Sequence, residues 1–310
     1  MKYSYLDAGV DIKKADELTN IIANTACGAN IGSFAGLYEH KVLKDYCFAA
    51  CCDGIGTKII PLIERHDTKT IANDLFAMNI NDLICCGAKP LFFLDYIAAN
   101  TLDTKLLGDF IKDLNTLLQK YGCTLLGGET SELSNLILKN YFDAAGFLLG
   151  IVKKDEILNI NTVSGGDVII GLKSNGVHAN GFSLIRKLYS DNMINTETFT
   201  QTLAPVRIYY DIVSKLCENK LVKSCANITG GGILANLKRA VKKDLKIELD
   251  YSKIPNMKIF EILKDLTGEK EAYGTFNMGA GFCLVVSSLN VKKVLDLTQD
   301  YTPFIFGEIV

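Results

Sequence analysis

The chain has 310 residues, and the usual domain size of about 100–200 residues predicts two domains. Its formal net charge of −2, from 33 basic and 35 acidic residues, lacks the basic excess of a general nucleic-acid binder. No apolar run approaches the ~20 residues that span a bilayer, and the N-terminus lacks the apolar core of a signal peptide. We therefore expect a cytoplasmic protein with neither a nucleic-acid nor a membrane partner.

The ten cysteines show no Cys-x-x-Cys spacing, so buried thiols are expected rather than a zinc site or a disulfide framework.

Hydrophobic periodicity predicts alternating helices and strands in both halves of the chain. In the first half we expect helices over 11–26, after Lys58, from 73 to just before Gly87, and over 105–121; the expected strands are 46–52, 90–96, 124–132 and 141–152. In the second half we expect helices over 182–188, 205–218, 233–241, 258–266 and 291–297; the expected strands are 167–172, 246–250, a strand near Phe276, 281–286 and 304–309. The polar stretch 153–166 suggests a boundary, which predicts an N-terminal domain 1–153 and a C-terminal domain 154–310, both α/β.

The helix that starts near Asn73 has an unusual polar face. Asn73 or Asp74 can cap its start, and Gly87 suits the left-handed residue after its end. Helical spacing groups its apolar residues on one side and places four others opposite, namely Asp74, Met78, Asn81 and Asp82. This second face lacks the Lys, Glu, Gln and Arg that usually cover an exposed helix. It is either solvated or part of a site for a hard cation or polar ligand.

Several glycine-rich loops follow predicted strands. Asp53–Lys58 lies between a strand and a helix, an arrangement that can cradle phosphate, although it is not a Walker A loop. The strand 124–132 ends in a glycine pair followed by acids. Carboxylates at such ends suit Mg²⁺ bound to a nucleotide, and a general acid–base pair is the competing interpretation. The loops 174–181 and 229–232 are further candidates, whereas 28–37 is either a ligand loop or an ordinary turn.

Together these motifs resemble those of the aminoimidazole ribonucleotide synthetases, also called phosphoribosylformylglycinamidine cyclo-ligases. The resemblance covers nearly the whole chain and is carried by the segments 5–12, 32–37, 53–58, 74–78, 81–83, 87–96, 127–130, 174–181 and 229–232. The Asp-Gly-x-Gly-Thr-Lys and Gly-Gly-Glu-Thr motifs are shared with a wider ATP-dependent superfamily. Pro90–Tyr96 and Tyr5–Ile12 are more particular to the cyclo-ligases.

The resemblance implies two α/β domains, with the N-terminal sheets pairing into a barrel across a homodimer. It implies ATP-dependent ring closure of formylglycinamidine ribonucleotide to aminoimidazole ribonucleotide in purine synthesis, with release of ADP and phosphate. The expected route passes through an iminophosphate, and the expected cofactors are ATP and Mg²⁺.

The same resemblance assigns roles to individual residues. The expected Mg²⁺ ligands are Asp53, Asp74, Asn81 and Glu129. Three residues are expected to be catalytic. His178 would carry a proton or bind substrate only, Lys58 would neutralise phosphate charge, and Asp82 would support the Mg²⁺ ligands. The expected ATP- or substrate-phosphate-binding residues are Gly54, Gly56, Thr57, Lys58, Gly127, Gly128, Thr130, Ser174, Asn175, Gly176, Asn180, Gly230, Gly231 and Gly232.

The chain departs from the family pattern at three places. Asn227 stands where the family usually has His, Ser131–Asn135 lacks the family's proline, and Ala179 stands where Ser is usual. Two rival hypotheses remain: another enzyme of the superfamily, or an inactive dimeric binding protein with this fold.

Overall fold

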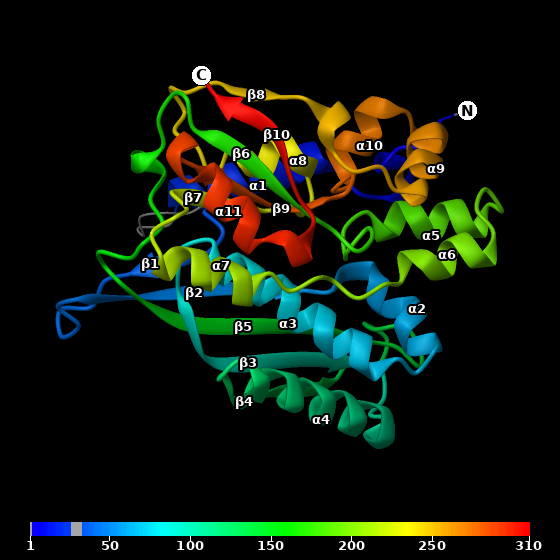
Figure 1. The fold of residues 1–310 in the computed structure, drawn as a ribbon. Helices are drawn as coiled ribbons and strands as arrows, with labels where there is room; N and C mark the ends of the chain where they lie inside the picture. Colours follow the sequence, from blue (N-terminus) through cyan, green and yellow to red (C-terminus); the bar gives the residue numbers. More distant parts are fainter. Residues whose placement is uncertain (1, 26–32) are drawn as a thin grey trace.

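The computed structural model describes residues 2–25 and 33–310 (Figure 1). The predicted loop over 28–37 therefore lies partly outside the described residues, as does Cys27. Within the described part, the chain forms two α/β units, each built on a five-stranded sheet.

The first sheet has the order β1-β2-β5-β3-β4. Its strands are β1 (Gly36–Tyr38), β2 (Tyr46–Gly54), β3 (Lys89–Ala99), β4 (Thr124–Glu132) and β5 (Phe142–Lys153). β3 and β4 are parallel, because α4 (Thr104–Lys120) crosses over between them, and the other pairs are antiparallel. The remaining helices of this half are α1 (Ile12–Thr25), α2 (Ile59–Glu64) and α3 (Thr68–Ile84).

The second sheet is antiparallel throughout, in the order β7-β9-β6-β10-β8. Its strands are β6 (Val168–Lys173), β7 (Ser224–Asn227), β8 (Ile247–Leu249), β9 (Ala280–Val286) and β10 (Pro303–Ile309). Its helices are α5 (Phe182–Ser190), α6 (Thr196–Thr202), α7 (Tyr210–Glu218), α8 (Gly232–Leu237), α9 (Lys258–Thr267), α10 (Glu269–Thr275) and α11 (Val291–Leu297).

Helix α3 is the element that joins the two units. It packs on β2 and β5 of the first sheet and also contacts α7 and β7 of the second unit (Figure 1). Asp74 and Asn81 on its polar face are completely buried, so neither of these two residues is solvated. The predicted start at Asn73 or Asp74 is wrong. Asp67 caps the helix by accepting a hydrogen bond from the Thr70 amide, so α3 begins one and a half turns earlier than expected.

Three other expectations are corrected by the structure. Residues 204–209 form neither helix nor strand, so the helix predicted to begin at Pro205 begins at Tyr210. Phe276 follows the end of α10 and is not in a strand. The helical spacing of Leu18, Ile21 and Ile22 predicts a packed apolar side for α1, but these side chains are 57%, 61% and 48% exposed.

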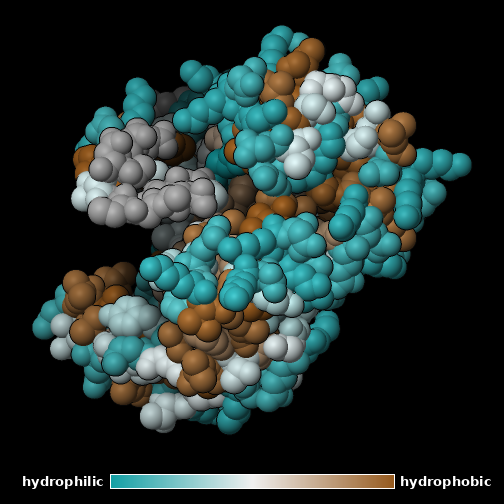
Figure 2. All heavy atoms as spheres, turned by 90° about the vertical axis from the view of Figure 1, so that its left-hand side faces the viewer, coloured by the Kyte–Doolittle hydropathy of each residue, from teal (hydrophilic) through white to brown (hydrophobic). Residues whose placement is uncertain are grey.

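One face of the first sheet carries α3 and α4, and the opposite face is open. Strand alternation places several apolar side chains on this open face, including Phe147 and Tyr96, which are 36% and 45% exposed. Hydrophobic residues gather on the lower lobe in Figure 2, the lobe that contains this sheet. The sheet does not close into a barrel within the described chain. No helix of the described residues is both long and apolar enough to cross a membrane.

Candidate active-site cleft

A cleft of about 650 Å³ lies between the two units. Its walls come from the end of β2, the following turn, β5, and two loops of the C-terminal unit. The lining residues are Tyr5, Asp53, Gly54, Ile55, Gly56, Thr57, Met78, Asp143, Ala145, Ala179, Asn180, Phe182, Ser183, Thr229 and Gly230. The structure therefore brings the predicted Asp53–Thr57 turn together with Asn180 and Gly230, although more than 100 residues separate them in the chain.

Asp53 is held rigidly at the floor of the cleft. Asn79, on α3, accepts a hydrogen bond from the Asp53 amide and donates one to the Asp53 carbonyl, both at 3.1 Å. The Gly54 amide donates to the Asp53 carboxylate at 2.8 Å. Burial raises the pKa of Asp53 to about 6 despite that hydrogen bond and the positive charge of Arg239. No ion pair within residues 2–25 and 33–310 involves Asp53, so a bound cation would offset the cost of its burial.

A second carboxylate, Asp82, is half-buried and lies outside the cleft lining. Asn227, at the end of β7, donates a hydrogen bond from Nδ2 to Asp82 Oδ1 at 2.8 Å. Burial raises the pKa of Asp82 to about 7, and the negative charge of Asp53 acts in the same direction. Asn227 thus links the two units at the position where the family pattern has His. Asp82 can exchange a proton near neutral pH.

The raised pKa of Asp82 predicts a pH dependence of stability. The folded state holds this proton up to a pH of about 7, whereas the unfolded state releases it near 4, so stability falls as pH rises through this window. We expect Asp82→Asn to weaken that fall and to be more stable than the wild type above pH ~7. Thermal midpoints measured across this pH range test it. Parallel curves for the wild type and the variant would contradict the assignment.

The glycine loop 229–232 is shaped by side chains around it. Asn236, which is 1% exposed, donates from Nδ2 to the Thr229, Gly230 and Gly232 carbonyls at 3.3, 3.2 and 2.8 Å. A Cβ atom on Gly232 would lie 1.9 Å from the Tyr273 carbonyl oxygen, so only glycine fits there. Gly230 lines the cleft, whereas Gly232 packs against α10. The loop thus needs its glycines for packing as well as for access to a ligand.

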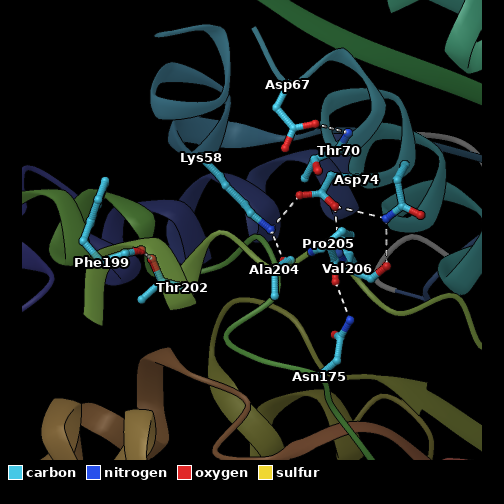
Figure 3. Close-up of polar contacts among 11 residues, drawn as sticks. Lys58, Asp67, Thr70, Asp74, Asn175, Phe199, Thr202, Ala204, Pro205 and Val206 are labelled. Carbon is cyan, nitrogen blue, oxygen red and sulfur yellow. Dashed lines mark hydrogen bonds and ion pairs between the residues drawn. The ribbon is translucent and has the colours of Figure 1, made fainter. Parts of the chain in front are cut away.

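Lys58, Asp74 and Asn81 lie outside the cleft lining. The Lys58 ammonium is 2.7 Å from the Asp74 carboxylate, and both side chains are fully buried (Figure 3). Asn81 donates to the Arg207 carbonyl and accepts from the Tyr209 amide, both at 2.9 Å. The polar face of α3 therefore binds the backbone of the segment 204–209, which forms neither helix nor strand.

Glu129 is far from Asp53 in one chain. Register pairs Gly54 with Ala145, Ala145 with Tyr96, and Tyr96 with Glu129. Three strand spacings separate Gly54 from Glu129, or about 14 Å. Alternation also turns Glu129 to the open face and Asp53 to the face covered by α3. The four predicted metal ligands Asp53, Asp74, Asn81 and Glu129 therefore do not meet within one chain.

The predicted loop 127–130 does not reach the cleft either. Gly127, Gly128 and Thr130 lie on the edge strand β4. A Cβ atom on Gly128 would lie 2.5 Å from both a backbone and a carboxylate oxygen of Asp95. The close approach of β3 is thus one physical reason for glycine at this position. Within the described residues, no three His, Cys, Asp or Glu side chains converge in a way that could hold a metal.

His178 lies beneath the cleft wall rather than on its surface. It is 2% exposed, its backbone φ is +61°, and its Nε2 atom has no hydrogen-bond partner in the described chain. Burial lowers the pKa of His178 to about 3, with further effects from Lys58 and Arg207, so the ring is neutral at physiological pH. The proton-carrier role predicted for His178 does not fit this environment.

The neighbouring predicted ligands Ser174 and Gly176 serve the C-terminal unit itself. The Ser174 hydroxyl donates to Asn277 Oδ1 at 3.0 Å, and Asn277 donates to the Gly176 carbonyl at the same distance. Both residues are buried, and neither is part of the cleft lining.

Sequence reasoning missed several residues of the cleft. Asp143 is the only acid in the apolar strand β5, and this signal could have identified it. The Tyr5 hydroxyl accepts a hydrogen bond from the Gly181 amide at 3.1 Å, and the hydroxyls of Thr57 and Ser183 are 3.1 Å apart. These contacts join segments that are distant in the chain, so no local sequence pattern predicts them.

Comparison with known families supports one assignment over most of the chain. Residues 33–152 match the family described as "AIR synthase related protein, N-terminal domain", and residues 164–310 match its C-terminal domain. A protein of Thermoanaerobacter sp. (strain X514) named phosphoribosylformylglycinamidine cyclo-ligase is 39% identical over 332 residues, covering 99% of this chain and 97% of the relative. One of the same name from Prochlorococcus marinus (strain MIT 9312) is 37% identical, covering 96% and 92%.

Solved structures of similar fold are more distant in sequence. Thiamine-monophosphate kinase from Stenotrophomonas maltophilia K279a has a TM-score of 0.67 at 16% identity, covering 95% of this chain and 92% of its own. T. maritima PurL complexed with ADP has a TM-score of 0.61 at 15% identity, covering 91% and 43%. At these identities the likeness establishes the fold alone.

Proposed function

From the premise that the chain belongs to the AIR synthase family, as a phosphoribosylformylglycinamidine cyclo-ligase, we propose how its cleft performs that reaction. The protein catalyses ATP-dependent ring closure of formylglycinamidine ribonucleotide to 5-aminoimidazole ribonucleotide in purine biosynthesis. The observation that carries this function is the match to cyclo-ligases over nearly the full length of both proteins.

The route we infer passes through an iminophosphate. The γ-phosphoryl group of ATP moves to the formyl oxygen and ADP leaves. The amidine nitrogen then forms the ring C–N bond, the C–O bond to phosphate breaks, and the nitrogen loses a proton. Such chemistry needs positioned reactants and neutralised charge more than covalent help from the protein. The Gly54–Thr57 turn is suited to hold phosphate, since its backbone lines the cleft beside Asp53.

Mg²⁺ fits the carboxylates that face the cleft. This ion usually binds one or two protein carboxylates, with phosphate oxygens and water completing its coordination. Asp53 and Asp143 both line the cleft, and neither forms an ion pair within the described residues. We assign Asp53 as the carboxylate that would hold it, because Asp143 stands on the opposite, open face of the sheet. The bound ion would neutralise charge on the ATP phosphates.

Asp82 is the better candidate for the proton that leaves the ring nitrogen. Its pKa of about 7 suits proton exchange near neutrality, and Asn227 fixes its orientation. Burial, by contrast, lowers the pKa of His178 to about 3, so its ring is a weak base near neutral pH.

We therefore expect His178→Asn to leave the single-turnover rate within about threefold of the wild type, because Asn tolerates the positive φ of this position. Rapid-quench measurement of product formation tests this. A drop of about 100-fold or more in a folded variant would restore His178 as the proton carrier.

A homodimer is supported by the open face of the first sheet. This face exposes apolar side chains including Phe147 and Tyr96, which two copies could cover by pairing their sheets into a barrel. Asp143 and Ala145 stand on the same face and also line the cleft, so the interface would border the site.

Phe147→Asp is expected to give a monomer, because a carboxylate would be buried at the centre of that interface. Sedimentation equilibrium of the wild type and of Phe147→Asp measures the oligomeric state of each. An equally dimeric variant would place the interface elsewhere.

A direct assay tests the function. Purified protein with Mg-ATP and formylglycinamidine ribonucleotide should form the aminoimidazole product, detected colorimetrically, with one ADP per product. Thiamine monophosphate, the substrate class named for a protein of similar fold, should not be turned over under the same conditions. Absence of the aminoimidazole over a range of Mg²⁺ and K⁺ concentrations would refute the proposal.

A further inference from the structure

Residues Ala204, Pro205 and Val206, which belong to no helix or strand, form a strap between the two units. Every carbonyl of the strap accepts a hydrogen bond from a side chain (Figure 3): Lys58 Nζ to Ala204 at 2.7 Å, Asn175 Nδ2 to Pro205 at 2.7 Å, and Asn73 Nδ2 to Val206 at 2.9 Å. The Val206 amide donates to Asp74 Oδ1 at 2.7 Å. Side chains from both units thus hold three consecutive residues.

The strap is attached to both sides of the cleft. Lys58 directly follows the Gly54–Thr57 turn, which lines one wall. Asn175 is the second residue of the loop 174–181, whose residues Ala179 and Asn180 line the opposite wall. A shift of the strap would therefore change the spacing of the two walls.

The Lys58 ammonium already has polar partners within the protein. It contacts Asp74 Oδ2 and the Ala204 carbonyl, both at 2.7 Å, and lies 5.5 Å from the centre of the Phe182 ring. Reaching a phosphate in the cleft would leave the Asp74 carboxylate, which is 0% exposed, buried without its cation. An uncompensated buried charge is strongly unfavourable.

The geometry points to a positioning role for Lys58, Asp74 and Asn175: through the strap they set the distance between the two walls of the cleft, and they do not contact ATP or substrate. This inference rests on the proposed function only for its kinetic readout. If the wild type does not form the aminoimidazole, the proposed function is refuted. If the wild type is active but the variants described below do not show their expected kinetics, only the strap inference is refuted.

A double-mutant cycle separates positioning from phosphate binding. Lys58→Gln leaves a buried carboxylate without its cation, and Asp74→Asn leaves a buried ammonium without its anion. Each change should displace the strap and the two walls of the cleft, and so lower kcat by at least about tenfold. In Lys58→Gln/Asp74→Asn the two amides can bond to one another and to Ala204 without buried charge. We expect kcat of the double variant to recover to within about threefold of the wild type, with an unchanged KM for ATP.

The matched control is the exposed pair Lys89–Glu218, which also joins the two units, at 2.8 Å and with both side chains more than half exposed. Lys89→Gln and Glu218→Gln should leave kcat and KM unchanged, because exposed pairs contribute little. A folded double variant at Lys58 and Asp74 that stays as inactive as Lys58→Gln would overturn the inference, as would a tenfold rise of its KM for ATP.

Asn175 provides a second test that does not depend on buried charge, because its side chain is exposed. Asn175→Asp turns an oxygen toward the Pro205 carbonyl and should lower kcat several-fold, more than Asn175→Ala does, while KM for ATP and for the ribonucleotide stays constant. A raised KM for either ligand in both variants would make Asn175 a ligand contact, and an unchanged kcat in both would remove the strap from the mechanism. Either outcome refutes the inference even if the Lys58 variants fail to fold.

Discussion

Lys58→Met is expected to destabilise the protein by about 3–5 kcal/mol, because it leaves the Asp74 carboxylate buried without its cation. Both side chains of the pair are 0% exposed, and their charged atoms are 2.7 Å apart. Two further hydrogen bonds to Asp74, from the Val206 amide and the Asn73 side chain, remain after the change but do not supply positive charge.

Urea denaturation measures this loss. The chain contains no tryptophan, so far-ultraviolet circular dichroism is the suitable signal. Lys89→Met, which removes the exposed ion pair to Glu218, is the matched control and should cost less than about 1 kcal/mol. Adding Asp74→Leu to Lys58→Met should recover part of the loss. Equal and small effects of the Lys58 and Lys89 changes would show that water reaches the Lys58–Asp74 pair.

Asp53→Asn is expected to lower kcat by about 100-fold or more, because an amide cannot hold Mg²⁺ against the ATP phosphates as a carboxylate does. The change is nearly isosteric, and Asn79 binds only the backbone of residue 53, so the fold should persist. Burial raises the pKa of Asp53, which means that its charge is unfavourable in the metal-free protein. The metal-free variant should therefore be at least as stable as the wild type near neutral pH.

Steady-state kinetics over a series of Mg²⁺ concentrations test this prediction alongside thermal unfolding without Mg²⁺. Asp296→Asn, on the exposed surface of α11, is the control and should behave as the wild type. Near-normal activity of Asp53→Asn at every Mg²⁺ concentration would move the metal site elsewhere. A marked loss of stability would make Asp53 a structural residue.

The local elements of this chain were largely predictable. The strand 124–132 was predicted with the bounds that the structure gives, and α4, β2 and β5 differ from prediction by one or two residues. Alternating or helical spacing of apolar residues carries this information, because each element buries one face on its own sheet. The Asp53–Thr57 turn was also predicted as a ligand loop, and the structure places it in the cleft.

The errors arose where one unit meets the other. The segment 204–209, predicted to be helical from Pro205, contains no helix, since Lys58, Asp74 and Asn81 take up the Ala204 carbonyl and the Val206 and Tyr209 amides. The polar face of α3 was assigned to a cation for the same reason. Short side chains without Lys or Glu indicate a buried polar face, but they do not say whether a ligand or another part of the chain covers it.

The sequence by itself determined the family, most of the helices and strands, and the residue types available for phosphate and metal. Only the tertiary structure decided which of these residues meet. Asp53, Asn180 and Gly230 share a cleft, whereas Asp74 and Asn81 hold a backbone segment and Glu129 lies three strands away on the other face. The physical reason is that a local pattern reports which face of an element is buried, while the partner on that face depends on strand order and on the packing of the two units.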